Sequence, residues 1–124
     1  MANELILVVE DNEKNRKLVR DVLIFKGYRL AEAETGEDGV RLAKELRPDL
    51  ILMDIQLPGI NGIAALGQIR EDPALRHTPV IAVTASAMTH DRQKIMAAGF
   101  DGYQSKPLNV KDFLVAVRGL LDRT

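Results

Sequence analysis

The sequence predicts a single doubly wound α/β domain, in which helices cover both faces of a parallel sheet. Apolar runs alternate with helical patterns about five times along the chain, as right-handed strand–helix–strand crossovers require. The strongest runs, such as Leu5–Val9 and Leu50–Met53, are apolar throughout, which is typical of strands buried on both faces. The 124 residues suit one domain and contain no solenoid repeat, low-complexity tract or linker.

The first half of the chain is expected to form strands at 5–9 and 29–33 and helices at 13–26 and 37–46. Gly27 follows the first helix and Pro48 the second, and both residue types end helices. The spacing of apolar residues predicts which side chains face the core: Leu18, Val19, Val22, Leu23 and Phe25 in the first helix, and Val40, Ala43 and Leu46 in the second.

The second half is expected to form strands at 50–53, 80–83 and 102–105 and helices at 62–70 and 89–98, followed by a last helix that Asn109 caps. The strand at 102–105 is the weakest, because Gln104 and Ser105 are polar. The last helix has the clearest stripe for burial, formed by Val110, Phe113, Leu114, Val117, Leu120 and Leu121.

The composition excludes several classes of protein. With 46% hydrophobic residues, 28% charged residues and a net charge of -1, the chain is neither disordered nor a strongly basic nucleic-acid binder. It has no cysteine, which excludes disulfides and thiol chemistry. No apolar run approaches the ~20 residues of a membrane span, and the amino terminus lacks the features of a signal peptide. A cytoplasmic protein is expected.

Functional side chains follow four of the five predicted strands. They are Glu10 and Asp11 after the first strand, Asp54 after the third, Thr84 after the fourth and Lys106 after the fifth. In open α/β sheets ligands bind beyond these carboxyl ends, so we expect the five side chains to meet there. Asp49 opens the third strand instead, and is expected to be a turn residue.

These residue types suit the chemistry of a phosphoryl group. Two or three carboxylates can bind Mg²⁺, which prefers oxygen ligands and keeps several waters. A carboxylate can also act as a nucleophile and form an aspartyl phosphate, while a lysine and a hydroxyl contact phosphoryl oxygens.

Four spaced motifs, one at each of these strand ends, give the chain a strong resemblance to the response-regulator receiver domains of two-component signalling (the CheY-like superfamily). They are Val9-Glu10-Asp11-Asn12, Leu52-Met53-Asp54-Ile55-Gln56-Leu57-Pro58 with Gly62 after it, Val83-Thr84-Ala85, and Tyr103-Gln104-Ser105-Lys106-Pro107. The resemblance covers essentially the whole chain. It implies a flavodoxin-like (βα)5 fold with strand order 2-1-3-4-5.

The resemblance also implies a role for each site residue. Asp54 would accept a phosphoryl group from a phosphohistidine. Mg²⁺ would be bound directly by Asp11 and Asp54, through water by Glu10, and by the backbone carbonyl of Gln56. Lys106 would contact the phosphoryl group, and the Lys106–Pro107 peptide would be cis. Thr84 would be the switch hydroxyl, Tyr103 the aromatic residue that moves with it, and the small Ala85 would leave space for that ring.

The chain differs from the family pattern at the acidic pair, and the roles of two nearby helix residues stay open. The acidic pair after the first strand is Glu-Asp rather than two aspartates, which leaves metal binding plausible. Asn15 and Arg16 lie one turn into the first helix, close to the acidic residues. Two interpretations stay open for them, an ordinary solvated helix face or a docking surface for the phosphodonor.

The expected function is that of a single-domain response regulator, with residues 1–124 as the receiver and no output domain. A histidine kinase or a histidine phosphotransfer protein would donate the phosphoryl group. The signal would pass to a protein target through helix 4, strand 5 and helix 5, without nucleic acid or membrane. Within the family, the chain is most similar to small stand-alone cell-cycle receivers, and the receiver of a hybrid kinase is the alternative.

Two rivals from other functional classes are less well supported. A metal-dependent aspartyl-phosphate phosphatase typically needs a second acid two residues after its nucleophile, where this chain has Gln56. A flavin or nucleotide carrier needs a glycine-rich or hydroxyl-rich loop after the first strand, where the acidic residues would repel phosphate. We therefore expect a signalling switch rather than an enzyme, although it would assist its own phosphorylation and dephosphorylation.

Overall fold

A computed structural model describes residues 3–85 and 89–123, and shows a parallel sheet in the order β2-β1-β3-β4-β5. The strands are β1 Leu5–Val9, β2 Arg29–Ala33, β3 Leu50–Asp54, β4 Val80–Thr84 and β5 Gly102–Ser105. This confirms the predicted fold class and strand order. The order reverses between β1 and β3, so their carboxyl ends form the switch point at which α/β sheets bind ligands.

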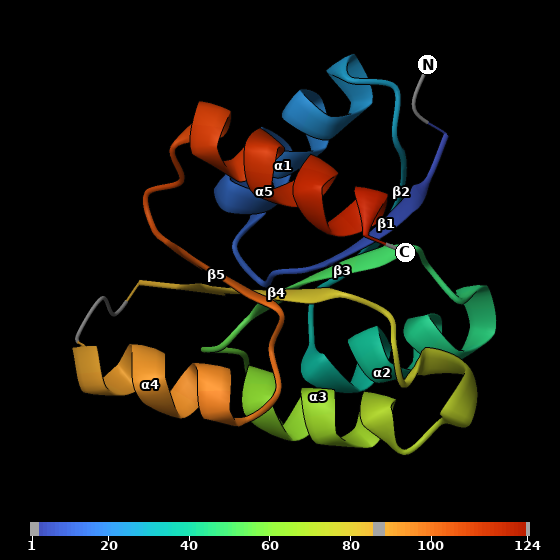
Figure 1. Ribbon diagram of the computed structural model, residues 1–124, viewed down its shortest axis with the longest axis vertical. Helices are drawn as coiled ribbons and strands as arrows, with labels where there is room; N and C mark the ends of the chain where they lie inside the picture. The colour runs from blue at the N-terminus through green and yellow to red at the C-terminus, as the bar shows by residue number, and fades with distance from the viewer. Residues whose placement is uncertain (1–2, 86–88, 124) are drawn as a thin grey trace.

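Helices cover both faces of the sheet. Figure 1 shows α1 and α5 on one side and α2, α3 and α4 on the other. Their bounds are α1 Glu13–Phe25, α2 Gly36–Leu46, α3 Gly62–Arg70, α4 Thr89–Ala97 and α5 Val110–Asp122, with a short 3-10 helix at Pro73–Leu75 that was not predicted. Within the described part of the chain, no helix has both the length and the apolar character needed to cross a membrane.

Asparagine caps define where three helices begin. The side chains of Asn12, Asn61 and Asn109 each accept a hydrogen bond from a backbone N–H in the first turn of α1, α3 and α5, respectively. Such a cap satisfies a donor that the helix itself leaves unpaired, and is typically worth about 1 kcal/mol. The predicted cap at Asn109 is confirmed. Asn12 starts α1 immediately after Asp11, which keeps the acidic residues at the edge of the sheet.

The core has two layers because neighbouring strand residues point to opposite faces. In β1, Ile6 and Val8 pack towards α1 and α5, whereas Leu7 and Val9 pack towards α2, α3 and α4. All five residues of β3 are buried, including Asp54 at its end. A carboxylate therefore occupies a position that otherwise continues an apolar strand, and burial alone does not favour it there.

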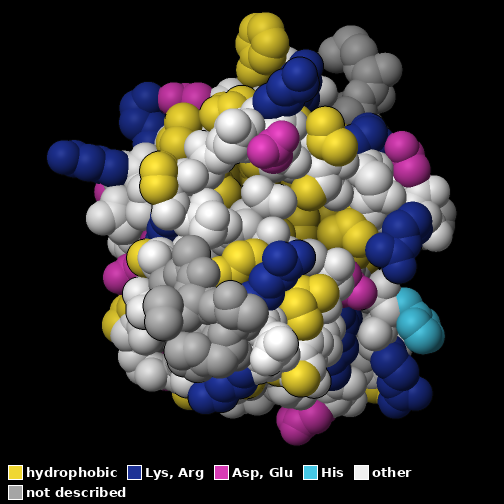
Figure 2. Space-filling model, turned by 60° about the vertical axis from the view of Figure 1, so that its left-hand side comes forward, with side chains coloured by type: hydrophobic (Ala, Val, Ile, Leu, Met, Phe, Trp, Pro, Cys, Tyr) yellow, Lys and Arg dark blue, Asp and Glu magenta, His cyan; other side chains and the backbone are white. Residues whose placement is uncertain are grey.

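Four residues that were predicted to face the core are exposed instead, and three of them lie at helix ends. Phe25 is 84% exposed, Leu46 43% and Val110 40%. Each is the first or last residue of its helix, where the apolar stripe extends past the edge of the sheet. Leu18, adjacent to the buried Val19, is exposed as well. Figure 2 shows hydrophobic side chains on the upper part of the molecule, the side of α1 and α5, among charged ones.

The polar strand β5 lies at the edge of the sheet, next to β4. Gln104 is half-buried and Ser105 is exposed, so the edge position accommodates the polar residues that made this strand hard to predict. Its carboxyl end delivers Lys106 next to the end of β4.

Candidate functional site

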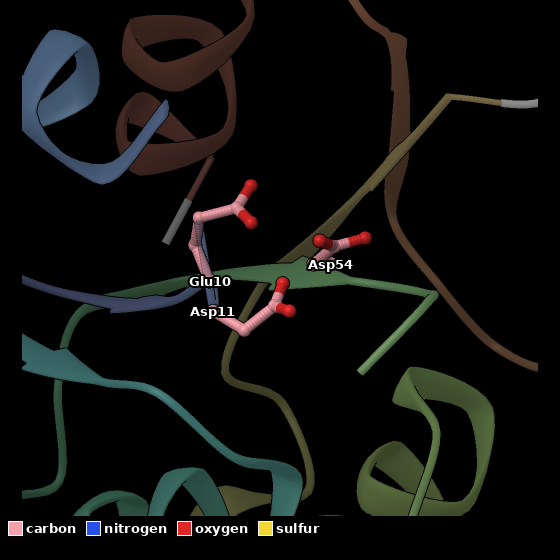
Figure 3. A group of neighbouring side chains, drawn as sticks. All are labelled: Glu10, Asp11 and Asp54. Carbon is pink, nitrogen blue, oxygen red and sulfur yellow. The ribbon is translucent and has the colours of Figure 1, made fainter. Parts of the chain in front are cut away.

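The carboxylates of Glu10, Asp11 and Asp54 meet at the switch point. Val9 pairs with Met53 in the parallel β1–β3 ladder, so the residues that follow β1 lie beside Asp54. One oxygen from each carboxylate can be chosen so that all three lie within 4.8 Å of one another. Figure 3 shows the three side chains extending from the ends of β1 and β3. The predicted convergence is therefore present in the structure.

Two of the three carboxylates are buried and held by backbone donors. Glu10 is 5% exposed and Asp54 is 3% exposed, whereas Asp11 faces solvent. The N–H of Asn12 donates to Glu10 Oε2 at 3.1 Å, and the N–H of Gln56 donates to Asp54 Oδ1 at 3.0 Å. Each bond links a carboxylate to the N–H two residues further on, and the Asp54 bond has the local geometry that aspartate adopts in turns.

Lys106 connects the two buried acids. Its Nζ lies 2.7 Å from Glu10 Oε1 and 3.0 Å from Asp54 Oδ2. Burial alone would lower the pKa of Lys106, but its hydrogen bonds to Glu10 and Asp54 outweigh that effect and raise the pKa. Burial raises the pKa of Glu10, and the nearby Asp54 adds to this, while Lys106 opposes it. The ammonium therefore stays charged and partly neutralises the acidic cluster.

A backbone hydrogen bond joins Lys106 to Thr84. The N–H of Lys106 donates to the carbonyl oxygen of Thr84 at 2.8 Å, which continues the ladder that pairs Thr84 with Ser105. Thr84 is buried, and the Lys106–Pro107 peptide is cis, in agreement with the expectation. The fourth and fifth strands thus bring the hydroxyl-bearing residue and the cation to the same edge as the acids.

Gly62 allows α3 to begin against the end of β3. Its N–H donates to the carbonyl of Ile55 at 3.0 Å. A Cβ atom at this position would lie 2.4 Å from the carbonyl oxygen of Asp54 and 2.9 Å from Ile55 Cα, closer than real Cβ atoms approach backbone. The glycine that follows the second motif is therefore explained by packing around Asp54.

Tyr103 and Thr84 share one face of the sheet. Tyr103 pairs with Ala82 in the β4–β5 ladder, and Ala82 and Thr84 lie two residues apart in β4. Tyr103 is half-buried against the α2–α4 layer, with the guanidinium of Arg92 from α4 at 5.7 Å from its ring centroid. Ala85, directly after Thr84, is exposed.

The donor set fits a hard divalent cation. Oxygen ligands of one octahedral Mg²⁺ at about 2.1 Å lie at most about 4.2 Å apart. One oxygen from each of the three carboxylates lies within 4.8 Å of the other two, which is close to that spacing. The acidic cluster could therefore hold a metal ion. Asp49 is at the opposite end of β3, where it accepts the N–H of Leu5 at 2.8 Å, and is outside the cluster as predicted.

The sequence interpretation missed the position of Arg16. Neither interpretation placed it in the interior, but it is 8% exposed and its Nη1 donates to the carbonyl oxygen of Glu10 at 2.9 Å. Its place on α1, one turn after the acidic pair, was visible in the sequence. The signal was ambiguous because arginine is seldom this buried unless it is paired.

The comparison with known families identifies a response regulator receiver domain over residues 6–118. Among curated proteins, the polar-differentiation response regulator DivK of Brucella anthropi is 45% identical over 116 residues, which are 94% of each chain. DivK of Brucella ovis is 44% identical over the same share of both chains.

Solved structures agree with this relationship. The receiver domain of sensor histidine kinase PA1611 from Pseudomonas aeruginosa, which has a magnesium ion coordinated in its active site cleft, has a TM-score of 0.91 and 35% identity. The match covers 98% of this chain and 99% of that one. A CheY-like receiver domain protein from Methanospirillum hungatei has a TM-score of 0.89 and 28% identity, over 98% and 96% of the two chains. This chain therefore belongs to the response regulator receiver domain family of two-component signalling.

Proposed function

We propose that Asp54 is the phosphoacceptor of this receiver, and that a phosphohistidine on a histidine kinase or a phosphotransfer protein is the donor. The observation that carries the proposal is the arrangement around Asp54. A nearly inaccessible carboxylate at the end of β3 lies 3.0 Å from a lysine ammonium and close to two further carboxylates. The exchange is proposed to take place in the cytoplasm.

In the proposed step, one carboxylate oxygen of Asp54 attacks phosphorus. The new O–P bond makes an aspartyl phosphate, while the P–N bond to the donor imidazole breaks and its electron pair stays on nitrogen. Negative charge on the phosphoryl oxygens must be offset for attack by a carboxylate to occur. Lys106 is placed to do this, because its Nζ already reaches Asp54 Oδ2 and can contact an oxygen on the incoming group.

We propose that Asp11 and Asp54 bind Mg²⁺ directly, that Glu10 binds it through water, and that the backbone carbonyl of Gln56 completes the protein ligands. When bound, the ion would neutralise both the carboxylates and the phosphoryl oxygens. The hydrogen bond from the Gln56 N–H to Asp54 Oδ1 supports this assignment, because it keeps the two residues in a tight turn at the edge of the sheet.

The switch is proposed to act through Thr84, Tyr103 and Ala85. After phosphorylation the Thr84 hydroxyl would move towards the phosphoryl group, and the Tyr103 ring would turn inwards past the small Ala85. The shared face of Thr84 and Tyr103 supports this coupling. The resulting population shift would change the surface formed by α4, β5 and α5, which is the proposed contact for a downstream protein.

We further propose that the chain acts as a single-domain regulator without an output domain. Similarity to DivK over 94% of both chains supports this. The receiver of a hybrid kinase remains the second candidate, since the PA1611 receiver is 35% identical. Both candidates use the same chemistry at Asp54 and differ only in how the receiver is connected to its partners.

Incubation with Mg²⁺ and acetyl phosphate, followed by intact-mass measurement, tests the proposal. Wild-type protein should gain one phosphoryl group that is stable in acid and labile in base. Asp54→Asn should gain none, and chelation of Mg²⁺ should abolish the gain in wild type. An unmodified wild type, or a phosphoryl group that persists in Asp54→Asn, would overturn the assignment.

A further inference from the structure

Arg16 is a buried cation at the start of α1 that reaches the end of β1. Its Nη1 donates to the carbonyl oxygen of Glu10 at 2.9 Å, and its Nε donates to Glu32 Oε1 at 3.1 Å. Its Nη2 pairs with Glu13, and Nη1 lies 3.5 Å from Glu34 Oε1. The planar guanidinium therefore joins α1 to the carboxyl ends of β1 and β2, a geometry that a lysine ammonium cannot reproduce.

The contact with Glu10 matters because of the peptide to which that carbonyl belongs. This peptide links Glu10 to Asp11, so its orientation sets how the two carboxylates are presented to Asp54. Besides its ion pair with Lys106, Glu10 makes three hydrogen bonds: its N–H donates to the carbonyl oxygen of Ala33 at 3.0 Å, its side chain accepts from the Asn12 N–H, and its carbonyl oxygen accepts from Arg16.

Asp11 has no such support of its own. It is exposed, and within residues 3–85 and 89–123 its carboxylate makes no hydrogen bond or ion pair. Its position relative to Asp54 is therefore determined by the backbone of residues 10–12. The Arg16 bond is the only side-chain donor to a backbone oxygen of this turn among the described residues.

We infer that Arg16 is a positioning residue for the metal site, which holds the Glu10–Asp11 peptide so that both carboxylates face Asp54. The inference rests on the proposed function, because it assigns Mg²⁺ to these carboxylates. Some residues do not bind the metal but hydrogen-bond to its ligands and orient them. Removal of such a residue typically lowers metal affinity about 10–100-fold.

Arg20 provides a matched control. It lies one turn further along α1 and shares two partners with Arg16: its Nη2 lies 2.8 Å from Glu32 Oε1 and 3.4 Å from Glu13 Oε1. Its described hydrogen bonds all go to these two glutamates, and none reaches the backbone at the end of β1. The two arginines thus differ in the bond to Glu10, while both contribute to the same ion-pair cluster.

The experiment compares Arg16→Met, Arg16→Lys and Arg20→Met with wild type. Mg²⁺ dissociation constants are measured on the unphosphorylated proteins by NMR titration of backbone amides, and amide exchange at Asn12 is measured without metal. Arg16→Met should raise the dissociation constant about tenfold or more and speed exchange at Asn12. Arg16→Lys keeps the charge and should restore neither, whereas Arg20→Met should match wild type in both measurements.

Equal affinity in wild type and both Arg16 variants would overturn the inference. So would an equal loss in Arg20→Met, because this would assign the effect to the ion-pair cluster as a whole. A wild-type protein that does not bind Mg²⁺ would overturn the proposed metal site. The exchange rate at Asn12 would then decide separately whether Arg16 holds this turn.

Discussion

Lys106 and Glu10 form an ion pair at the carboxyl edge of the sheet, with 2.7 Å between Nζ and Oε1. The same ammonium lies 3.0 Å from Asp54, so one cation serves two carboxylates that β1 and β3 bring together. Without a counter-charge, burial of both acids would be costly. Lys106 therefore has a structural role in the metal-free protein as well as its proposed role towards phosphate.

The first prediction concerns the loss of this cation. Lys106→Met should lower the free energy of unfolding by about 1.5–3 kcal/mol, because it leaves charged acceptors without their donor. Mg²⁺ should restore part of this loss, and should stabilise the variant more than wild type, because the ion would neutralise the same carboxylates. Urea unfolding with and without Mg²⁺ measures both effects.

Lys111→Met is the control for that experiment, because Lys111 is exposed on α5. Its stability should stay within about 0.5 kcal/mol of wild type. Equal stabilities for Lys106→Met and Lys111→Met would show that the Lys106 bridge contributes nothing to the metal-free fold.

The second prediction follows from Glu4, whose Oε2 lies 2.6 Å from Arg118 Nη2. The hydrogen bond from Arg118 lowers the pKa of Glu4 from 4.5 to about 2. Because the folded protein favours ionised Glu4, the resulting stability is present above the unfolded pKa and is lost as the pH falls through the folded one. At neutral pH, Glu4→Gln should cost about 0.2–1 kcal/mol, the range of exposed pairs.

Urea unfolding from neutral pH down to about pH 2 measures this difference. The difference in the free energy of unfolding between wild type and Glu4→Gln should shrink steadily towards the acidic end, where the pH approaches the folded pKa of Glu4. A difference of constant size across this range would contradict the assigned ion pair.

The third prediction compares two glycines of α3. Gly62→Ala should cost about 1–3 kcal/mol, because its methyl group would overlap the backbone of Asp54 and Ile55. Gly67 has nothing within 4 Å of an added Cβ atom, so Gly67→Ala should stabilise the helix by up to about 1 kcal/mol. Thermal unfolding of the two variants should shift in opposite directions, and a stabilising Gly62→Ala would refute the close approach.

The fourth prediction tests the proposed switch. Ala85→Leu should fill the space into which the Tyr103 ring is proposed to turn, while leaving Asp54 and its partners intact. Phosphorylation by acetyl phosphate should proceed as in wild type, but the phosphorylated variant should lose the gain in partner binding. The measurement is a pull-down with phosphorylated and unphosphorylated forms, and an unchanged gain would exclude the inward ring as the signal.

Much of the fold could be predicted because the strongest strands carry an unambiguous pattern. Leu5–Val9 and Leu50–Met53 are apolar throughout, and only strands buried on both faces require this. Exposed helix ends could not be predicted, because Phe25 and Val110 continue an apolar stripe beyond the sheet that it covers. The helical spacing of apolar residues does not indicate where the sheet that they pack against ends.

The convergence at the site followed from topology. Parallel strands place their carboxyl ends at one edge, so Glu10, Asp11 and Asp54 were expected to meet before any distance was known. Arg16 was different, because its contact is with a backbone carbonyl that every residue carries. The carboxylates of the proposed metal site are therefore easier to predict from a sequence than Arg16, the side chain inferred to orient them.

The most direct test asks whether Asp54 itself carries the phosphoryl group. After incubation with Mg²⁺ and acetyl phosphate, borohydride reduction converts an aspartyl phosphate to homoserine, which mass spectrometry of peptides locates. We expect homoserine at position 54 alone, and only when both Mg²⁺ and the phosphodonor were present. Reduction products at Asp11 or Glu10, or an unmodified Asp54 in phosphorylated protein, would contradict it.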